Sequence, residues 1–453
     1  MHQSSREDFL TRIRESAIGD GAMFETPFGE RSLVYADYTA SGRALSFIED
    51  YVREQVLPFY ANTHSESSMC GARTSRLYAW ARQEIVTALN CRPSDRVIFC
   101  GAGTTAAVHK WIDLLGLKDP PAEGTAVPLV IIGTYEHHSN DLPWRELNVE
   151  RFVVPLDQAG HLDQTVLEQT LMTHAGKRRI ICSFSAASNV TGLLTDVEGI
   201  TALCRRYGAL CGWDYAAAAP YVRMDMQTGG GVDAIFFSPH KFVGGPDTPG
   251  VLAVDTASVT RLKPTQPGGG TVTFVSQERQ TYAADLGVRE EPGTPNIIGG
   301  IRAGLAMKVR QTVGTDYIEQ RDAEITRRVF GRLANNSDIT ILGSQTAPRL
   351  PVFSMQFSSN GQPLHFGFVV SLLNDLFGIQ CRGGCSCAGS YGHHLLDISE
   401  EASIELERKV VAEGLVHRPG WVRLSFHYAS TDSTIDYVLD ALEFIAANGS
   451  NYL

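Results

Sequence analysis

The chain has 453 residues, of which 43% are hydrophobic and 20% are charged, so disorder, collagen and coiled coil are excluded as descriptions of it. No apolar run approaches the roughly 18–20 residues that a membrane span requires, and the first residues lack a signal-peptide pattern, so we expect a cytoplasmic protein that does not enter a membrane. A net charge of −11 disfavours nucleic-acid binding but is compatible with a single phosphate held in a local pocket.

The nine cysteines are too few and too scattered for a disulfide scaffold, and most lie in apolar runs typical of reduced core thiols. The exception is a cluster of Cys381, Cys385 and Cys387 in a glycine-rich segment. Its spacing matches no common zinc or iron–sulfur site, so we predict no bound metal.

Between about residues 95 and 254, short apolar runs alternate with helical patterns. The predicted strands are Arg96–Cys100, Leu129–Ile132, Arg179–Ser183, Ala209–Trp213, Ala234–Phe237 and Val251–Val254. A helix with Val108, Trp111, Ile112 and Leu115 on one face follows the first strand. Because the runs lack polar alternation, they indicate a mostly parallel sheet buried on both faces. Right-handed crossovers then bring the polar residues that follow the strands to one edge, where ligands bind.

The pattern changes after about residue 300. One helix is predicted with Ile318, Ile325, Val329 and Leu333 on one face. A second helix is predicted with Ile435, Val438, Leu439 and Leu442 at helical spacing. Thr431 is the expected N-cap of the second helix. Strands are predicted at Ile339–Leu342 and Val352–Phe357. We therefore expect a large domain over residues 30–300 and a small α+β domain formed by residues 1–29 and 301–453.

Lys241 is the first candidate catalytic residue. It follows Ser238 and His240 directly after the predicted strand Ala234–Phe237. Partial desolvation at the end of a buried strand lowers a lysine pKa and favours a nucleophilic amine. Such an amine can form a Schiff base with pyridoxal phosphate. A surface lysine in a loop is the alternative interpretation.

Asp214 is the natural partner of Lys241, because it ends the strand one strand–helix–strand unit earlier, 27 residues before the lysine. We expect the two side chains to open into one cleft. An acid beside the pyridine nitrogen keeps that nitrogen protonated, so that the ring withdraws electrons from the substrate Cα. A helix N-cap is the alternative role for Asp214.

Two further segments reach the same edge. Gly101–Thr105 precedes a helix and offers backbone N–H groups and hydroxyls to one phosphate, with Ser238 and His240 completing its shell, but it lacks dinucleotide or ATP spacing. His137, which follows the predicted strand Leu129–Ile132, could stack on a cofactor ring and move protons. A solvated loop is the alternative for His137.

Ten segments, in order along the chain, resemble those of a known family. They are Tyr35–Ser41, Tyr60–His64, Gly103–Thr105, Glu136–Asn140, Ser188–Gly192, Asp214–Ala217, Ser238–Lys241, Gly268–Thr271, Gly293–Asn296 and Arg382–Ala388. The chain is similar to the class V aminotransferases, which have the α/β fold of type I pyridoxal-phosphate enzymes, and among them to the group II cysteine desulfurases. The resemblance implies a seven-stranded, mostly parallel sheet flanked by helices.

The resemblance also implies roles for individual residues. Lys241 would be the Schiff-base lysine, Asp214 the pyridinium partner and His137 the stacking group with a catalytic role. The phosphate would be held by Thr104, Thr105, Ser238 and His240, together with Thr271 from the neighbouring subunit, so a homodimer with shared active sites is expected. Asn189, Arg423 and His64 would bind the amino-acid substrate; a guanidinium suits a carboxylate because it binds both oxygens.

Cys387 matches the cysteine that forms a persulfide in the resembled family, and Arg382 supplies a positive field that favours its thiolate. Inert structural thiols are the alternative for the cysteine cluster. The chain differs from the family pattern at Ala217, which replaces a glutamine that contacts the cofactor, and at Cys385 and Ser386, which replace histidines. The residues after Cys387, Ala-Gly-Ser, also differ from the usual ending.

These observations predict a pyridoxal-phosphate-dependent lyase that abstracts the Cα proton of L-cysteine or a close analogue and transfers its sulfur to Cys387. A sulfur-acceptor protein is a further expected partner. The alternative is a lyase, or an enzyme that forms C–C bonds or decarboxylates, on another small amino acid without sulfur transfer. A binding or sulfur-carrier protein is a third interpretation, which the presence of both Lys241 and Asp214 disfavours.

Overall fold

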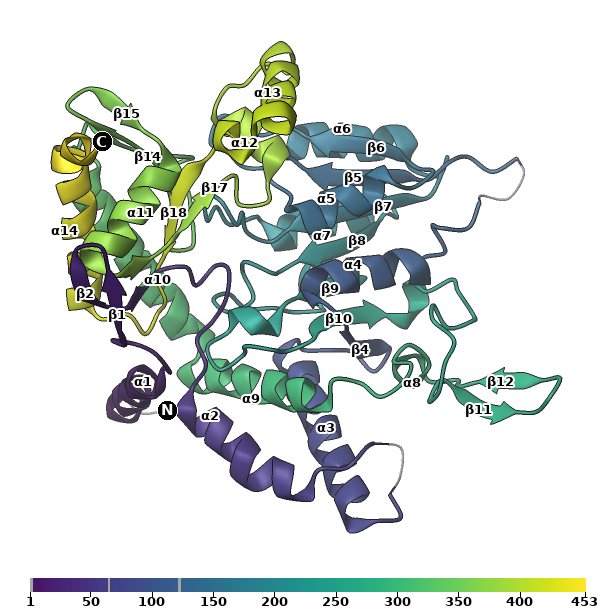
Figure 1. Ribbon diagram of the computed structural model, residues 1–453. Helices are drawn as coiled ribbons and strands as arrows, with labels where there is room; N and C mark the ends of the chain where they lie inside the picture. The colour runs from purple at the N-terminus through teal and green to yellow at the C-terminus, as the bar shows by residue number, and fades with distance from the viewer. Residues whose placement is uncertain (1–2, 64–65, 121–123) are drawn as a thin grey trace.

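The structure is a computed structural model that describes residues 3–63, 66–120 and 124–453 (Figure 1). Its centre is a seven-stranded sheet in the order β4-β10-β9-β8-β7-β5-β6, in which β10 alone is antiparallel to its neighbours. The strands are β4 (Asp95–Cys100), β5 (Leu129–Gly133), β6 (Glu150–Val154), β7 (Ile180–Ser185), β8 (Leu210–Asp214), β9 (Ala234–Phe237) and β10 (Gly250–Asp255). The predicted mostly parallel sheet is confirmed, and β6 is an addition to the predicted strands.

Helices cover both faces of this sheet, because its strands are apolar on both sides. The helices are α3 (Met69–Ala88), α4 (Gly103–Leu114), α5 (His138–Arg145), α6 (Gln164–His174), α7 (Val197–Arg206) and α9 (Ile297–Val313). Helices α4 and α5 form one core with strand residues such as Ile98 and Phe236. The other four pack on the opposite face, against residues such as Phe99 and Trp213. The result is a three-layer structure whose strand ends are open at one edge.

A second, antiparallel sheet of β13, β14, β15, β17 and β18 packs on its own helices. Its strands are β13 (Ile339–Ile341), β14 (Val352–Ser359), β15 (Gln362–Leu364), β17 (Arg382–Gly384) and β18 (Trp421–Ser425), and its helices are α10 (Thr315–Leu333), α11 (Phe366–Phe377) and α14 (Asp432–Asn448). The N-cap expected at Thr431 is confirmed, since its side chain accepts a hydrogen bond from the Thr434 N–H.

The beginning of the chain packs beside this second sheet. The hairpin of β1 (Met23–Thr26) and β2 (Gly29–Ser32) contacts α11, and β3 (Val34–Tyr35) pairs with β16 (Ile379–Gln380). Helix α1 (Gln3–Ser16) lies against α9, and α2 (Ser46–Tyr51) leads toward α3. Residues that are distant in sequence therefore meet next to β17 and β18.

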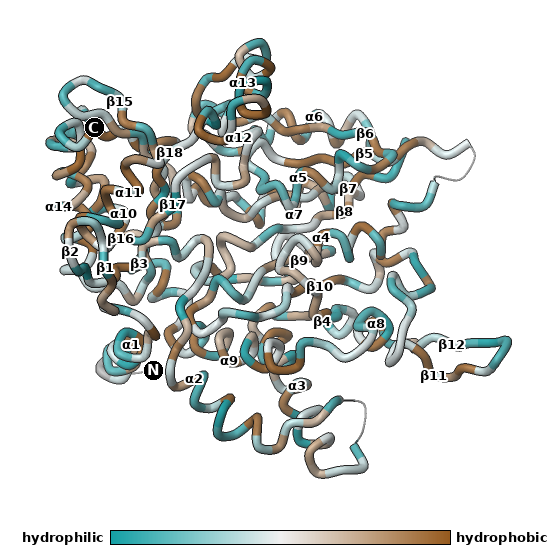
Figure 2. The backbone as a smooth tube through the Cα atoms, in the orientation of Figure 1, coloured by the Kyte–Doolittle hydropathy of each residue, from teal (hydrophilic) through white to brown (hydrophobic). Residues whose placement is uncertain are grey.

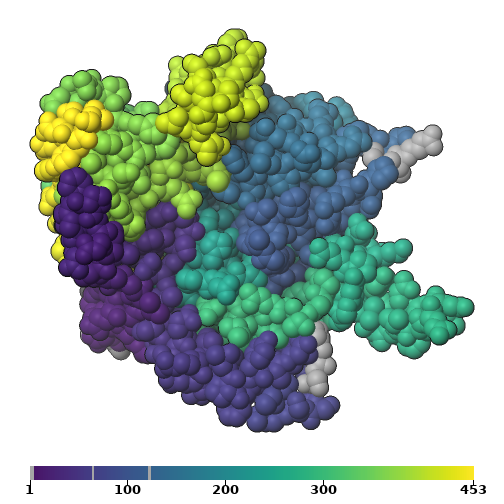
Figure 3. Space-filling view, in the orientation of Figure 1, coloured from purple at the N-terminus to yellow at the C-terminus, as the bar shows by residue number. Residues whose placement is uncertain are grey.

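Two segments project from the body in Figures 1 and 3. One is the hairpin of β11 (Val272–Val275) and β12 (Gln280–Tyr282), followed by α8 (Leu286–Arg289). The other contains α12 (Gly389–Leu395) and α13 (Glu400–Glu413). Figure 2 shows hydrophobic residues on β11, and the side chains of Phe274 and Val275 are both 60% exposed. An exposed apolar strand of this kind is typical of an interaction surface.

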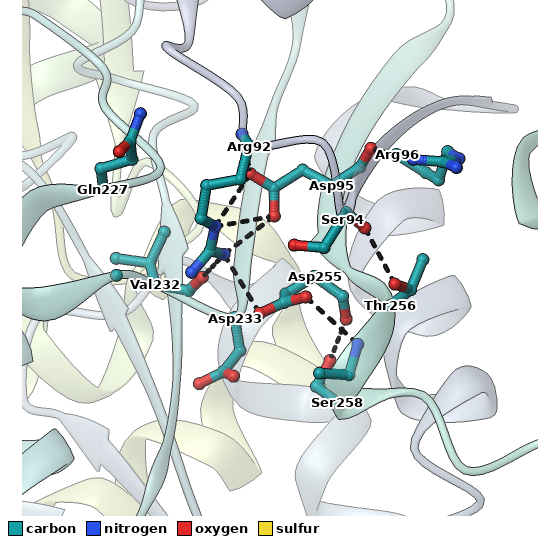
Figure 4. A network of polar contacts seen from close by, with 12 residues as sticks. Arg92, Ser94, Asp95, Arg96, Gln227, Val232, Asp233, Asp255, Thr256 and Ser258 are labelled. Carbon is teal, nitrogen blue, oxygen red and sulfur yellow. Dashed lines mark hydrogen bonds and ion pairs between the residues drawn. The ribbon is translucent and has the colours of Figure 1, made fainter.

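A network of ion pairs closes the edge of the central sheet opposite the open strand ends (Figure 4). Arg92 donates to Asp95 at the start of β4 and lies 3.3 Å from Asp255 at the end of β10. Asp233, just before β9, pairs with Arg205. These three aspartates are more than nine-tenths buried, and the arginines compensate their negative charges.

Within the described residues, no helix has both the length and the apolar character needed to cross a membrane. The same ranges contain no group of three or more His, Cys, Asp or Glu side chains that could hold a metal ion. All nine cysteines are free thiols.

Candidate active site

A cavity of about 410 Å³ lies at the open edge of the central sheet, where the loops after five strands meet the second sheet. It is lined by Thr39, Ala40, Ala102, Gly103, Thr104, Thr105, His137, Ser139, Asn189, Asp214, Ala216, Ser238, His240, Lys241, Thr248, Arg382, Ser386, Cys387 and Arg423. Ten of the candidate residues from the sequence are in this set. The parallel sheet explains their convergence, since the carboxyl ends of its strands share one edge.

Lys241 and Asp214 open into this one cavity, as the chain order predicts. Asp214 is the last residue of β8, and Lys241 ends the short turn Pro239–Lys241 that follows the neighbouring strand β9. Asp214 Oδ1 accepts a hydrogen bond of 2.7 Å from the Ala216 N–H. Among the described residues, neither Asp214 Oδ2 nor Lys241 Nζ has a hydrogen-bond partner, so both are available to a ligand.

Burial shifts the ionisation of both groups. Loss of hydration lowers the pKa of Lys241 to about 8, although the charge of Asp214 opposes this change. The same loss of hydration raises the pKa of Asp214 to about 6, against the hydrogen bond from Ala216 and the attraction of Lys241. The lysine is thus close to the point at which its amine becomes nucleophilic at neutral pH.

We expect the attachment of pyridoxal phosphate to the apoprotein to follow the titration of Lys241. Only the neutral amine reacts, so the rate should rise about tenfold per pH unit below pH 8 and level off above it. Stopped-flow absorbance measures this rate, and Nα-acetyl-lysine, whose amine titrates near pH 10, corrects for the reagent's own ionisation. A corrected rate that keeps rising through pH 10 would contradict the lowered pKa.

The N-terminus of α4 forms a small polar cradle in the cavity wall. Ser238 Oγ lies 2.8 Å from both the backbone N and Oγ1 of Thr104, and Thr105 Oγ1 lies 2.6 Å from Ser139 Oγ. Gly103 has φ of 57°, and a Cβ placed there would lie 2.9 Å from Ser238 Oγ, so only glycine keeps this cradle open. Hydroxyls and a helix N-terminus together suit one phosphate.

Two histidines of the cavity are neutral. Loss of hydration, together with nearby Lys241, lowers the pKa of His137 to about 3 and that of His240 to about 4. His137 Nδ1 accepts a hydrogen bond of 3.1 Å from the Ser139 N–H, which places the ring proton on Nε2. A neutral ring can stack on a flat cofactor without adding charge to the site.

A buried carboxyl group supports His137 from behind the cavity. Glu136 accepts hydrogen bonds from the Ser185 hydroxyl (2.7 Å), the Asn140 amide (2.6 Å) and the Ser185 and Gly133 N–H groups. Burial raises its pKa to about 7. This network links the end of β5 to β7, and it fixes the position of His137 and of the first turn of α5. Glu136 belongs to one of the matching motifs, but its sequence position alone predicts no role for it.

Cys387 lies in a tight turn on the cavity wall. Ser386 and Cys387 have φ of 54° and 55°, and the Ala388 N–H donates to the Cys385 carbonyl across the turn. Two consecutive non-glycine residues in the left-handed region are strained by about 1–3 kcal/mol each. The turn is held by Asn189 Nδ2, which donates to the Ser386 carbonyl at 2.7 Å, and by the His138 N–H, which donates to the Cys387 carbonyl at 2.8 Å.

Arg423 brings a buried positive charge to the same cavity. It lies on β18, is 3% exposed, and donates to the Asn189 carbonyl at 3.0 Å and to Asp37 at 2.8 Å. Burial lowers its pKa below the usual range of arginine, but an arginine remains charged at neutral pH. Asp37 also binds Arg382. Asp37 has no predicted function, since no local pattern shows that the residues after β3 lie beside the end of β18.

Thr271 and Ala217, both singled out in the sequence, do not line the cavity. Thr271 is fully buried at the base of the β11–β12 hairpin, where its hydroxyl donates to the Gly268 carbonyl. Ala217 is buried, and its neighbour Ala216 lines the cavity instead. His64 falls outside the described residues.

The family described as aminotransferase class V matches residues 34–438. The chain belongs to the class V aminotransferase family. It is an enzyme of this pyridoxal-phosphate-dependent family, and the resemblance noted in the sequence is confirmed.

Several relatives are named as probable cysteine desulfurases. One from Halalkalibacterium halodurans is 28% identical over 79% of this chain and 84% of its own, and one from Streptomyces coelicolor is 27% identical over 98% of this chain and 96% of its own. These names belong to the relatives.

Two solved structures have the same fold. The apo cysteine desulfurase from Thermococcus onnurineus superposes with a TM-score of 0.75 at 22% identity, over 91% of this chain and 94% of the other. The cysteine desulfurase CsdA from Escherichia coli, solved as an S-sulfonic acid, has a TM-score of 0.75 at 20% identity, over 96% and 97% of the two chains. The fold of type I pyridoxal-phosphate enzymes predicted from the sequence is confirmed.

Proposed function

We propose that this protein is a pyridoxal-phosphate-dependent, cysteine desulfurase-like lyase that removes sulfur from L-cysteine or a close analogue. The observation that carries the proposal is that Cys387, an exposed thiol, lines the same cavity as Lys241 and Asp214. A thiol at that position can take up a sulfur atom where the lysine acts. The names of the relatives support the same reaction.

The residues present fit pyridoxal phosphate. Lys241 Nζ is available to bind the cofactor aldehyde, and Asp214 Oδ2 is available to accept a hydrogen bond from the ring nitrogen. The cradle formed by Thr104, Thr105 and Ser238 would hold the phosphate, and His137 would lie against the ring. When bound, the cofactor supplies an electron-withdrawing ring that makes the substrate Cα–H bond acidic.

Side chains of this protein would carry out the remaining steps. Arg423 would bind the substrate carboxylate, helped by Asn189, and so place the substrate Cα near Lys241. Lys241 Nζ, with its lowered pKa, would remove the Cα proton. Asp214 would keep a negative charge against the ring nitrogen. The thiolate of Cys387 would then attack the substrate sulfur, and the bond between this sulfur and the substrate Cβ would break with its electron pair left on carbon. The carbon would take up a proton, so that alanine leaves, and the sulfur would stay on Cys387 as a persulfide.

Mass spectrometry of the cysteine-treated protein tests the proposed function. The holoenzyme is incubated with L-cysteine, alkylated without reductant and digested. We expect one additional sulfur atom on the peptide that contains Cys387 and none after incubation with L-serine. Extra sulfur found only on another cysteine, such as Cys70, or sulfide released with no sulfur on any cysteine, would contradict the proposal.

We propose a homodimer in which the β11–β12 hairpin contacts the partner subunit. The hairpin extends away from its own domain (Figures 1 and 3), its apolar side chains are exposed, and Thr271 lies at its base rather than in the cavity of its own chain. The cradle residues Thr104, Thr105, Ser139 and Ser238 offer hydroxyls but carry no positive charge. A residue contributed by the partner would complete it.

Charge introduced into the hairpin is expected to dissociate the dimer. The double variant F274D/V275D should weaken self-association at least about tenfold, because two apolar side chains would no longer be buried at the interface. Sedimentation velocity measures the association. The matched control is V411D, which places a charge at a similarly exposed valine on α13. A stable monomer of the unmodified protein would contradict the expectation.

We also propose that an acceptor protein collects the sulfur at Cys387. This thiol is exposed and borders the cavity, so a partner thiol can approach it from outside. The acceptor would present a nucleophilic group that attacks the outer sulfur of the persulfide and leaves the thiolate of Cys387 behind.

A further inference from the structure

Two arginines face one another beside the candidate active site. Arg382 on β17 and Arg423 on β18 are direct partners in the antiparallel register of these strands. Both line the cavity, and Arg423 is almost completely buried. Like charges at directly opposite positions repel one another, so this arrangement requires a counter-charge.

Asp37 supplies that counter-charge with one oxygen for each arginine. Its Oδ1 accepts a hydrogen bond of 2.8 Å from Arg423 Nη2, and its Oδ2 accepts one of 3.1 Å from Arg382 Nε. Asp37 is not itself part of the cavity wall. It holds the two arginines from outside the space that a substrate would occupy.

The backbone around Asp37 is fixed independently of these contacts. Asp37 forms a parallel bridge with Ser425 at the end of β18, and its carbonyl accepts hydrogen bonds from the N–H groups of Ala40 and Ser41 and from the Tyr35 hydroxyl. The carboxylate therefore has a defined position relative to β18. It can act as a fixed point against which a guanidinium is oriented.

We infer that Asp37 is the positioning residue that orients Arg423 for a substrate carboxylate. This inference rests on the proposed function, in which Arg423 binds that carboxylate. In the part of the chain that the structure describes, the Arg423 guanidinium donates to the Asn189 carbonyl besides Asp37, and its Nε is buried without a partner. Without Asp37, the guanidinium would keep one anchor and could rotate away from the productive orientation.

A simple effect of charge predicts the opposite result. If Asp37 acted only through its negative charge, its removal would make the cavity more positive and would strengthen the binding of an anionic substrate. Positioning requires two hydrogen-bond acceptors at fixed places. The amide of asparagine has one accepting oxygen and one donating NH2 group. Its oxygen can accept a hydrogen bond from one arginine, but its NH2 group would face the N–H donors of the other arginine. The two explanations therefore predict changes of opposite sign for Asp37→Asn.

Binding of two amines to the holoenzyme tests the inference. L-alanine carries a carboxylate but no sulfur, and ethylamine lacks the carboxylate; both can be titrated by the absorbance of the bound cofactor. We expect Asp37→Asn to weaken alanine binding about tenfold or more and to leave ethylamine binding within about twofold. Asp37→Glu, which keeps the charge but moves the oxygens, should also weaken alanine binding.

The outcomes separate this inference from the proposed function. Alanine and ethylamine binding equally well to the unmodified enzyme would show that Arg423 does not hold a carboxylate, and the proposed role of Arg423 would fail. If the unmodified enzyme prefers alanine, then unchanged or tighter alanine binding in Asp37→Asn overturns the role of Asp37 alone. Undiminished binding in Asp37→Glu also overturns it.

Two controls exclude a general loss of structure. Asp436→Asn removes an aspartate that pairs with Arg328 on the surface of the second domain, so it should leave alanine binding unchanged. The double variant D37N/R382M removes the competing guanidinium, so the single acceptor of the introduced asparagine can serve Arg423, and alanine binding should recover relative to D37N. Absence of recovery in a folded double variant would contradict the positioning role.

Discussion

Replacing Lys241 by alanine is expected to lower sulfide production from L-cysteine at least about 10³-fold. The variant loses the amine that would attach the cofactor and the base that would remove the Cα proton, and a general base alone contributes about 10²–10⁴-fold. The absorbance of the attached cofactor should vanish together with the activity. Steady-state sulfide release and the absorption spectrum of the reconstituted protein measure both effects.

A second lysine provides the control for this experiment. Lys308 is exposed on α9, where it pairs with Glu84, so Lys308→Ala should keep both the spectrum and the activity. A Lys241→Ala protein that folds, keeps the spectrum of attached cofactor and works within tenfold of the original rate would rule out Lys241 as the anchor.

Cys387→Ser is expected to lower sulfide release about 100-fold or more. A serine hydroxyl is a much weaker nucleophile than a thiolate and cannot hold the transferred sulfur. Steps before sulfur transfer should persist, because the groups that act on the substrate Cα are untouched. Exchange of the Cα hydrogen with solvent deuterium, followed by NMR, should therefore continue in the variant.

The neighbouring thiol is the matched control. Cys385 is two residues away in the same turn but does not line the cavity, so Cys385→Ser should keep most of the sulfide release. If Cys387→Ser released sulfide at an undiminished rate, sulfur would leave the substrate without a persulfide on this residue. That result would indicate that sulfide is eliminated from the substrate without passing through Cys387.

The sequence predicts the central sheet well because the physical signal there is local. The six predicted strands are buried apolar runs, and each matches a strand of the structure to within one or two residues at its ends. Strand β6 is absent from the prediction because it is an edge strand. The strand begins with two exposed residues, Glu150 and Arg151, so it has no continuous apolar run.

The candidate site could be predicted where residues follow strands. Lys241 and Asp214 come directly after neighbouring parallel strands, so chain order alone brings them to one edge. Asp37 and Ser139 illustrate the limit of this reasoning. Asp37 meets Arg423 through packing between segments that are 386 residues apart, and Ser139 joins the cavity because α5 begins at His138. Such contacts depend on tertiary packing, which no local pattern specifies.

The covalent attachment of the cofactor to Lys241 is the most direct test of this account. The protein is reconstituted with pyridoxal phosphate, treated with borohydride to make the link permanent, and digested for peptide mass spectrometry. We predict one pyridoxyl phosphate group per chain, on the peptide that contains Lys241. A modification on a different lysine, or none at all in a folded protein, would contradict the assignment of this cavity.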